Sequence, residues 1–463
     1  DAAERGLDVA LIERFDFGSG TSSRSTKLVH GGVRYLKQGN ITRVRDALRE
    51  RSLLLQNAPH LVHDQSFLIP CASLWQWFFY GVGLKLYDWL GSGNRFGQSR
   101  FVSAATALAM APALTSDRLK GAVVYHDGQF DDARLLIDMA YTAGASGACL
   151  ANYVIANELI KNDAGVICGV HATDSETGDS FEIRASVVIN AAGPFCDSVR
   201  RMDEADCEPM VAASQGVHLV LPKEFYPGDT AMIVPKTSDG RVIFIVPWHD
   251  CAIVGTTDTA IPDAVAEPLP QPDEVDFLLE TASRYLARPP SRSDVRSVFT
   301  GIRPLVKGDT SSRTASLSRD HVIRVSDSNL VTITGGKWTT VRKMAEDCVD
   351  RVIDLAKFSA GKCGTKSMAI SGAGLAKPIH PPLGIRRSEV VFAARYEMAR
   401  TVEDVLARRT RLLFLDSNAA TESAAIVASI LAEELGTDSA WIEEQVVAFG
   451  RTAKHYQLDD ESS

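Results

Sequence analysis

Two glycine-rich stretches of the sequence combine residue types suited to binding a phosphate-bearing ligand. The first, SGTSSRSTKLVHGGVRYL, spans Ser19–Leu36 and carries four serines, two threonines, three basic side chains and a histidine. Glycines let the backbone approach a ligand closely, and successive N–H and hydroxyl groups can cradle a phosphate. A serine-rich surface loop is the plainer alternative, but it explains poorly the continuation KLVHGGVRYL.

The second stretch, TGGKWTTVRK, spans Thr334–Lys343 and follows the apolar run LVTIT. The pattern predicts a strand, a glycine turn and then a helix. Backbone N–H groups at a helix N-terminus favour an electron-rich or anionic partner. The alternative is an ordinary strand-to-helix turn that is capped by Thr339 and Thr340.

Charged residues near these stretches could hold phosphate and ribose groups. Arg34, Arg303, Arg319 and Lys337 are candidates for phosphate, because guanidinium and ammonium groups bind it by charge and hydrogen bonds. Singly, each is more commonly a surface ion-pair partner. Glu13 ends the run VALIE, and an acid at this point of a βαβ unit can bind the ribose hydroxyls of a dinucleotide.

The elements that must position these residues can be outlined from the sequence pattern. Residues 1–14 suggest the end of a helix, a glycine at Gly6 and a buried parallel strand. The stretch 41–61 has a helical period, and the helix is predicted to stop at Pro59. A loop over 127–130 is predicted to precede a helix that begins near Asp131 or Asp132. SVVINAAGP predicts a buried strand that ends at Gly193.

The remaining chain divides into a strand-rich and a helix-rich half. Alternating runs between 216 and 255 predict antiparallel strands, and helices are expected from about Glu346 onwards. The longest expected helical run is SEVVFAARYEMARTVEDVLARR.

The composition limits which classes of protein are possible. The chain has 463 residues, 45% hydrophobic and 23% charged, which suits a globular protein of two or three domains. The net charge is −9 and no basic block runs along a helix, so a nucleic-acid partner is not expected. The eight cysteines have no zinc-type spacing, so we expect free thiols and no metal site.

The segment LWQWFFYGVGLKLYDWL, residues 74–90, has seven aromatic residues. Gln76, Lys85 and Asp88 interrupt it, so it is too polar to span a bilayer, and no other run predicts a transmembrane helix. It could lie flat on a membrane, because Trp and Tyr prefer the headgroup region. A core helix of a second domain is the alternative, and the sequence alone slightly favours it.

Eight motifs in order give the chain a resemblance to a known family. They are SGTSSRSTKLVHGGVRYL, DDARL, INAAGPFCDSV, VPWHDCAIVGTTD, GIRPL, LSRDH, GGKWTTVRKMAED and ARRTRLLFLD. Together they resemble the FAD-dependent glycerol-3-phosphate dehydrogenases, including the respiratory type that reduces quinone, over nearly the whole chain.

The resemblance implies an α/β plus α+β fold. It comprises a Rossmann-like FAD-binding domain of the glycine/D-amino-acid oxidase type, an interleaved antiparallel-sheet substrate domain and a C-terminal helical domain. We expect the FAD-binding domain at 1–65, 128–200 and 306–345, the substrate domain at 66–127 and 201–305, and the helical domain at 346–463.

The resemblance also assigns site residues. The residues implied to bind FAD are Glu13, Thr21, Ser22, Ser23, Lys27, Leu28, Gly193, Gly336, Lys337, Trp338 and Thr339. The residues that match the family's active-site positions are His30, Arg34, Tyr35, His218, Thr257, Arg303, Arg319 and Lys337. Among these we expect catalytic roles for His218, His30, Arg303 and Lys337, and substrate contacts from the others.

The implied reaction is oxidation of sn-glycerol 3-phosphate, with electrons passed to quinone at a membrane. A histidine near its ordinary pKa is a suitable base, and His218 is the first choice and His30 the second. Arg303, Arg319 and Lys337 would hold the phosphate and the developing alkoxide. The alternatives are a glycerol-3-phosphate oxidase, which carries an insertion not evident between 200 and 300, and an amino-acid oxidase, which the basic residues disfavour.

One departure from the family concerns the start of the sequence. The family begins with a strand and a glycine-rich turn, which bind the pyrophosphate and precede the pattern seen here. We therefore expect this polypeptide to be a fragment that binds FAD poorly by itself, and a non-catalytic fragment is a further alternative. The resemblance also implies peripheral attachment to the cytoplasmic face of the inner membrane, or to the mitochondrial inner membrane, and leaves a homodimer open.

Overall fold

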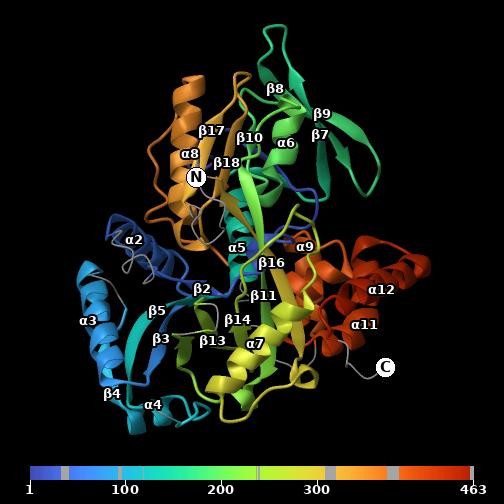
Figure 1. Cartoon of the computed structure of the whole chain (residues 1–463). Helices are drawn as coiled ribbons and strands as arrows, with labels where there is room; N and C mark the ends of the chain where they lie inside the picture. The colour runs from blue at the N-terminus through green and yellow to red at the C-terminus, as the bar shows by residue number, and fades with distance from the viewer. Residues whose placement is uncertain are drawn as a thin grey trace.

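The computed structural model describes residues 1–32, 41–91, 96–117, 119–235, 237, 240–307, 320–372 and 385–458. An α/β part, a large antiparallel sheet and a group of C-terminal helices are arranged around the segments that carry the predicted site (Figure 1).

The α/β part contains two short parallel pairings. Strand β1 (Ala10–Ile12) pairs with β6 (Cys149–Ala151), and β10 (Ile189–Asn190) pairs with β18 (Val331–Gly335). Strand β17 (His321–Val325) adds to β18 in antiparallel fashion. The helices of this part are α5 (Asp132–Ala145), α6 (Cys196–Asp203) and α8 (Val341–Ala356).

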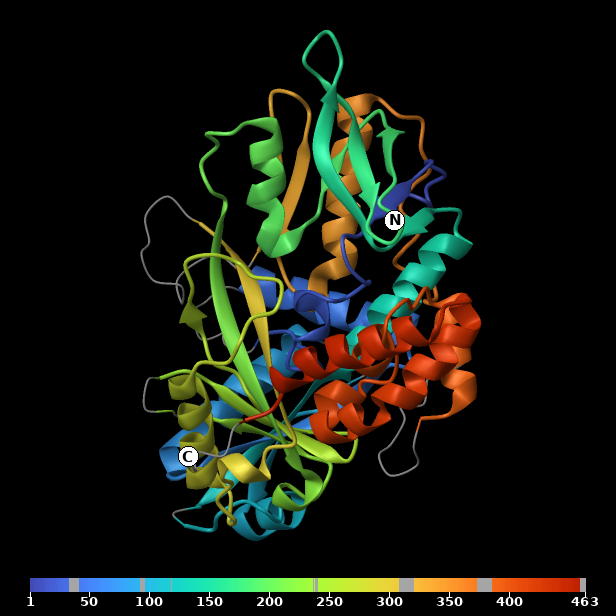
Figure 2. The ribbon, with the colours of Figure 1, turned by 90° about the vertical axis from the view of Figure 1, so that its right-hand side faces the viewer.

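A small antiparallel sheet projects from this part (Figure 2). It consists of β7 (Val154–Lys161), β8 (Ile167–Asp174) and β9 (Ser180–Arg184).

The large sheet is built around a central path of strands. Its order is β15 (Thr259–Ala260), β11 (Val211–Pro222), β14 (Cys251–Gly255), β13 (Ile243–Trp248), β12 (Ala231–Val234), β3 (Val62–Cys71), β5 (Gly121–Phe130) and β2 (Leu28–Val29). Strand β16 (Ser297–Val306) pairs with β11, and β4 (Arg100–Ser103) pairs with β5. The pairings along the path are antiparallel except β12 with β3.

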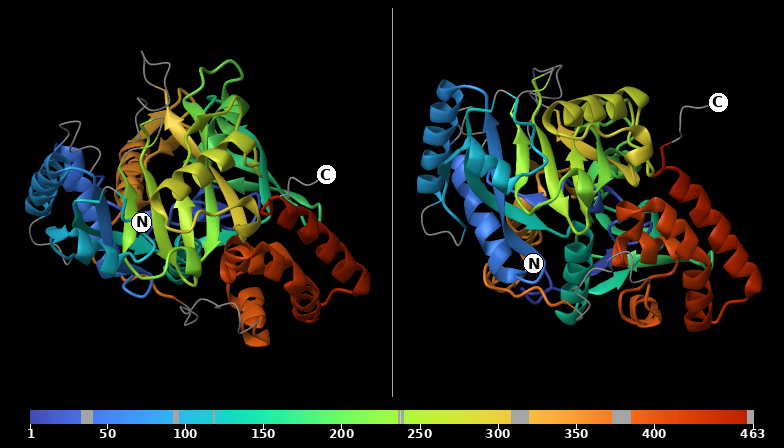
Figure 3. Two further views of the ribbon diagram at one scale, coloured as in Figure 1. Left: turned by 60° about the horizontal axis from the view of Figure 1, so that its bottom comes forward. Right: turned by 90° about the horizontal axis from the view of Figure 1, so that it is seen from below.

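Helices cover both sides of the large sheet. They are α2 (Ile41–Asn57), α3 (Leu74–Leu90), α4 (Ala104–Met110) and α7 (Pro272–Tyr285). The α7 side contributes Val275 and Leu278 to a core with Leu219 and Val254 of the sheet. Figure 3 shows α2 and α3 at the outer edge, on the side opposite the C-terminal helices.

The C-terminal helices pack directly on the large sheet. They are α9 (Arg387–Tyr396), the π-helical turn η7 (Asp404–Arg409), α10 (Leu412–Leu415), α11 (Ser417–Leu435) and α12 (Ser439–Lys454). Phe414 packs edge-on against Phe299 of β16, with ring centroids 5.2 Å apart. The buried Asp16 also forms ion pairs with Arg408 and Arg409, which fixes these helices to the α/β part.

Several sequence predictions are confirmed. Helix α2 ends at Asn57, just before Pro59, and the strands between 211 and 255 pair with one another in antiparallel fashion. Asp131 caps α5, since its Oδ1 accepts from the N–H of Arg134 at 3.0 Å. The strand, glycine turn and helix at 331–356 are present.

Other predictions are wrong in detail. Residues 2–6 form turns rather than a helix end, and β1 is parallel but exposed, with Leu11 45% accessible. Residues 127–130 continue β5 instead of forming a loop, because they complete its pairing with β3 and β2. The strand near 189 has only two residues, and Ile189 is exposed.

The expected long C-terminal helix is also wrong, because α9 ends at Tyr396 before the π-helical turn. The domain bounds stay a prediction, and the one expected between 345 and 346 lies within α8. This helix packs through Cys348 and Val352 on Val331 of β18, so its packing continues the α/β part. Within the described ranges, no helix combines the length and apolarity needed to cross a bilayer.

Candidate active site

The opening glycine-rich stretch reaches both the large sheet and the second glycine turn. Its η1 turn (Thr21–Ser23) is tied to β16, since the hydroxyl of Thr21 donates to the carbonyl of Ile302 at 2.6 Å. The indole N–H of Trp338 donates to the carbonyl of Ser22 at 2.8 Å. Segments more than 280 residues apart therefore meet around one turn.

His218 is buried where β11 faces this stretch. Its Nε2 lies 2.9 Å from the hydroxyl of Thr26, and its ring stacks on Phe299 with centroids 4.7 Å apart. Nδ1 is also buried and has no hydrogen-bond partner among the described residues. Burial, followed by the charges of Arg303 and Lys27, holds the pKa of His218 well below its usual value, so the ring is neutral at pH 7.

Two glycines give these side chains their room. Gly255 pairs with His218 across the β11–β14 ladder, and a Cβ there would lie 2.2 Å from Cδ2 of the imidazole. A Cβ on Gly216 would lie 2.3 Å from a guanidinium nitrogen of Arg303. Neither glycine was identified from the sequence, because its role depends on the register between distant strands.

Arg303 and Thr257 lie in the same region but have different environments. The guanidinium of Arg303 donates to the hydroxyl of Thr256 at 3.0 Å and lies 3.6 Å from Asp258, with the side chain 24% accessible. Thr257 is buried, where its hydroxyl accepts from the N–H of Val217 and donates to Glu274 at 2.7 Å. The Thr257 hydroxyl is thus fully used in holding the chain.

Lys27 is enclosed below the opening stretch. Its ammonium group lies 2.7 Å from Asp132, with both side chains inaccessible to solvent, and donates to the carbonyl of Ser23 at 2.5 Å. Its nitrogen also lies 4.9–5.1 Å from the ring centroids of Trp248, Phe299 and Phe414. Lys27 therefore fixes the η1 turn from within. Leu28 is buried at the start of β2.

The second glycine turn approaches the first through His30. Gly335 and Gly336 have φ of +79° and +76°, a left-handed conformation that favours glycine. The hydroxyl of Thr339 accepts from the N–H of His30 at 3.1 Å and donates to its carbonyl at 3.3 Å. Lys337 precedes the short η6 turn (Trp338–Thr340), which leads into α8.

Glu13 and Gly193 lie at strand ends of the α/β part. The Glu13 carboxylate accepts from the N–H of Phe15 at 3.0 Å, and burial raises the pKa of this carboxyl group. Gly193 has φ of +55°, and its carbonyl accepts from Thr334 at 3.2 Å. Arg34, Tyr35 and Arg319 lie outside the described residues.

The types of residue at these positions are suited to binding a flavin dinucleotide. The buried hydroxyl of Ser23 has no partner among the described residues, two left-handed glycines precede a 16-residue helix, and an acid follows β1. Glu13 would hold the ribose, the hydroxyls of η1 the phosphates, and the 336–339 turn the ring system.

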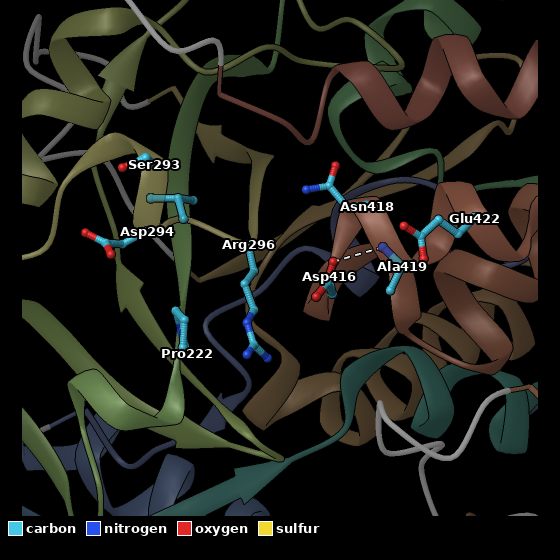
Figure 4. Close-up of a pocket in the computed structure, with 9 residues that line it drawn as sticks. Pro222, Ser293, Asp294, Arg296, Asp416, Asn418, Ala419 and Glu422 are labelled. Carbon is cyan, nitrogen blue, oxygen red and sulfur yellow. Dashed lines mark hydrogen bonds between the residues drawn. The ribbon is translucent and has the colours of Figure 1, made fainter.

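Two surface hollows lie apart from the predicted residues. One, of about 400 Å³, lies between Pro222, Arg296 and the start of α11, where Asp416 caps the helix at Ala419 (Figure 4). The other, of about 510 Å³, is bordered by Asp131, Trp248 and three histidines, His60, His63 and His249. None of the cofactor-binding or active-site residues predicted from the sequence lines either hollow.

Comparison with known proteins also indicates a protein that binds a flavin dinucleotide. A family model described as FAD dependent oxidoreductase matches residues 1–342, and one described as the C-terminal domain of alpha-glycerophosphate oxidase matches 326–442. A crystal structure of the glycerol-3-phosphate dehydrogenase from Bacillus halodurans complexed with FAD matches with a TM-score of 0.79 and 27% identity, over 99% of this chain and 93% of that one. The fold and the site thus define a flavin-dependent oxidoreductase.

Curated relatives give the narrower assignment. The chain is 38% identical to the mitochondrial glycerol-3-phosphate dehydrogenase SDP6 of Arabidopsis thaliana, over 94% of the chain and 80% of the relative. It is 39% identical to the mitochondrial glycerol-3-phosphate dehydrogenase of Rattus norvegicus, over 94% and 68%. The chain belongs to the family of FAD-dependent glycerol-3-phosphate dehydrogenases, and the fold class expected from the sequence is confirmed.

Proposed function

We propose that this dehydrogenase oxidises sn-glycerol 3-phosphate to dihydroxyacetone phosphate and passes the electrons to a membrane quinone. The observation that carries the catalytic part is the buried neutral His218 beside the positive Arg303. Bound FAD supplies the acceptor for the hydride.

His218 is the proposed base. When Nε2–H donates to the Thr26 hydroxyl at 2.9 Å, the lone pair of the neutral ring lies on Nδ1, which has no other partner among the described residues. Nδ1 can then take the proton of the C2 hydroxyl. The stacked Phe299 keeps the ring in this orientation.

The basic residues are proposed to hold the phosphate and the developing negative charge. Arg303 retains partial access to solvent while bound to Thr256, so its guanidinium can also reach an anionic ligand. Lys337 is supplied by the second glycine turn, and Arg34, Tyr35 and Arg319 keep their predicted substrate roles. The hydroxyl of Thr257 donates to Glu274, so we propose that Thr257 contributes to the substrate site indirectly, by fixing the backbone around it.

His218→Gln tests this assignment with His171→Gln as the control, since His171 lies on β8 with a side chain that is 45% accessible. We expect His218→Gln to lower kcat with a soluble dye by about 10²- to 10⁴-fold, the usual contribution of a general base. Flavin content should be unchanged, and His171→Gln should behave as the wild type. Unchanged turnover in His218→Gln would remove it as the base.

The acceptor and the location are separate parts of the proposal. Relatives named as mitochondrial dehydrogenases support peripheral attachment to an inner membrane. Quinone reduction should proceed without oxygen and without peroxide. Peroxide formed at the rate of substrate consumption would instead establish the oxidase alternative. This alternative is retained because the family model that matches the C-terminal part is named after an alpha-glycerophosphate oxidase.

A further inference from the structure

Glu274 is a buried carboxylate at the start of α7, and only 5% of the residue is accessible. Four donors converge on its two oxygens. They are the hydroxyls of Thr257 and Thr259 at 2.7 and 2.6 Å, the side-chain amide of Gln215 at 2.5 Å and the N–H of Gln271 at 3.1 Å. A carboxylate offers about four acceptor positions, so this one is fully used by the protein.

Helix capping explains one of these bonds. A glutamate at the third helical position commonly accepts from the N–H of the residue before the helix, which here is Gln271. The other three donors belong to the large sheet. Gln215 lies on β11, and Thr257 and Thr259 lie in the segment that leads from β14 into β15. This carboxylate therefore joins two separate strand segments to each other.

Arg303 lies on the opposite face of the same part of the sheet. It pairs with Ser214 across the β11–β16 ladder, and cross-strand partners point to one face. Gln215 is the next residue of β11, so its side chain points to the other face. Its carbonyl nevertheless accepts from the guanidinium of Arg303 at 3.3 Å. This one residue thus contacts Arg303 through its backbone and Glu274 through its side chain.

The second segment shows the same alternation. The guanidinium of Arg303 donates to the hydroxyl of Thr256 at 3.0 Å and lies 3.6 Å from Asp258. Thr257 stands between these two residues in the chain, and its hydroxyl donates to Glu274. The residues that contact Arg303 are therefore interleaved along the chain with those that Glu274 holds.

The packing around Arg303 leaves little room for movement of the backbone. The guanidinium lies directly over Gly216, where a Cβ would be 2.3 Å from one of its nitrogens. The hydroxyl of Thr257 also accepts from the N–H of Val217 at 2.9 Å, which fixes the two segments to each other beside this glycine. A displacement of either segment would therefore move the contacts of Arg303.

We propose that Glu274 is a positioning residue for Arg303. It holds the two segments so that the guanidinium is already oriented for an anionic group of the substrate, which preserves affinity because less freedom is lost on binding. Glu274 does not itself touch the substrate, because its acceptor positions are occupied by the protein. The substrate and the role of Arg303 are those of the proposed function, on which this proposal rests.

The test variant is Glu274→Gln in the flavin-loaded protein. It keeps the size of the side chain, but the new NH2 group must face either the two threonine hydroxyls or the two donors on the other oxygen. The matched control is Glu280→Gln on the same helix, where the side chain is 62% accessible and pairs with Arg284. KM and kcat for sn-glycerol 3-phosphate are measured with a soluble dye.

We expect Glu274→Gln to raise KM about tenfold, as for a weakened hydrogen bond to a charged group, and to change kcat less than about threefold. His218 keeps its own supports, the hydroxyl of Thr26 and the stacked ring of Phe299, so proton transfer should be largely retained. Glu280→Gln should change KM by less than about twofold. Flavin absorbance and thermal unfolding should show both variants folded and loaded.

Arg303→Lys separates positioning from a general structural effect. Lysine keeps the positive charge but lacks the planar fork that the two segments orient. If Glu274 acts through Arg303, adding Glu274→Gln to Arg303→Lys should raise KM by less than about twofold more. A structural role unrelated to Arg303 would give the same rise in both backgrounds. If Glu274→Gln does not fold, Thr259→Val supplies the same comparison with a rise of about threefold, because it removes one donor from the carboxylate.

Three results would overturn the proposal. They are an unchanged KM in Glu274→Gln, an equal rise of KM in both backgrounds, and an unchanged KM in Arg303→Lys. With an active wild type, each of these results would refute the positioning role and leave the reaction itself intact. A wild type that does not oxidise sn-glycerol 3-phosphate would instead refute the proposed function, and this proposal with it.

Discussion

Replacing Gly255 by alanine should displace His218 without altering any group that could do chemistry. The new Cβ would lie 2.2 Å from Cδ2 of the imidazole. Carbon atoms that are not bonded prefer about 3.5 Å or more, so the ring must retreat by about 1.3 Å. Phe299 blocks motion toward its own face, because the two rings are stacked 4.7 Å apart.

That displacement is large enough to break the orientation of the proposed base. Nε2 begins 2.9 Å from the Thr26 hydroxyl, and a retreat of this size takes it beyond hydrogen-bond range. A misplacement of about 1 Å in a reacting group can cost about hundredfold in rate, which corresponds to about 2.7 kcal/mol in the barrier. We therefore expect kcat of Gly255→Ala to fall about hundredfold.

The assay is dye reduction by sn-glycerol 3-phosphate at saturating substrate, with bound flavin measured by absorbance. Gly450→Ala is the control, because Gly450 lies in α12 and a Cβ there meets nothing within 4 Å. A Gly255→Ala protein that is folded, loaded with flavin and as active as the control would refute the reasoning, since the position of His218 would then not matter.

Two further predictions concern stability. Lys27→Met should lower the free energy of unfolding by about 3–5 kcal/mol, because it leaves the charge of Asp132 buried without its partner. Lys343→Met, which removes an exposed i,i+4 pair with Asp347, should lower it by about 0.5 kcal/mol or less. Thermal unfolding compares the two variants, and equal losses would contradict the role of the buried pair. Burial holds the pKa of His218 below its unfolded value of about 6.5, so the unfolded chain binds more protons than the folded one at low pH, and stability falls as the pH falls. Between pH 6.5 and 5.5 this group should contribute a loss of about 1.0 kcal/mol, since the unfolded histidine is already half protonated at pH 6.5. His218→Gln, measured by denaturant unfolding at both pH values, should reduce the loss by that amount, and an identical pH slope in the variant would show that the histidine also takes up its proton in the folded protein.

Local signals predicted much of the fold correctly. The cap at Asp131, the end of α2 near Pro59 and the glycine turn at Gly335 and Gly336 depend on residues close in sequence. The family motifs added the fold class, which the comparisons confirm. The domain bounds and the roles of the candidate residues, which the same motifs supplied, stay predictions.

The missed features depend on contacts between distant segments. The role of Gly255 follows from its pairing with His218, and the partner of Lys27 lies 105 residues away at Asp132. Sequence pattern also could not divide α3 into its buried and exposed sides, because aromatic residues occupy both. In β1, an apolar run that is typical of a buried parallel strand proved exposed at Leu11.

The central claim is that this chain uses His218 to oxidise sn-glycerol 3-phosphate on bound FAD. The most direct measurement is anaerobic mixing of the FAD-loaded protein with sn-glycerol 3-phosphate, followed by the visible absorbance of the oxidised flavin. We predict that the substrate bleaches this absorbance in a single turnover, that glycerol does not, and that His218→Gln slows the bleaching about 10²- to 10⁴-fold. Flavin that dithionite bleaches but sn-glycerol 3-phosphate leaves oxidised would contradict the account.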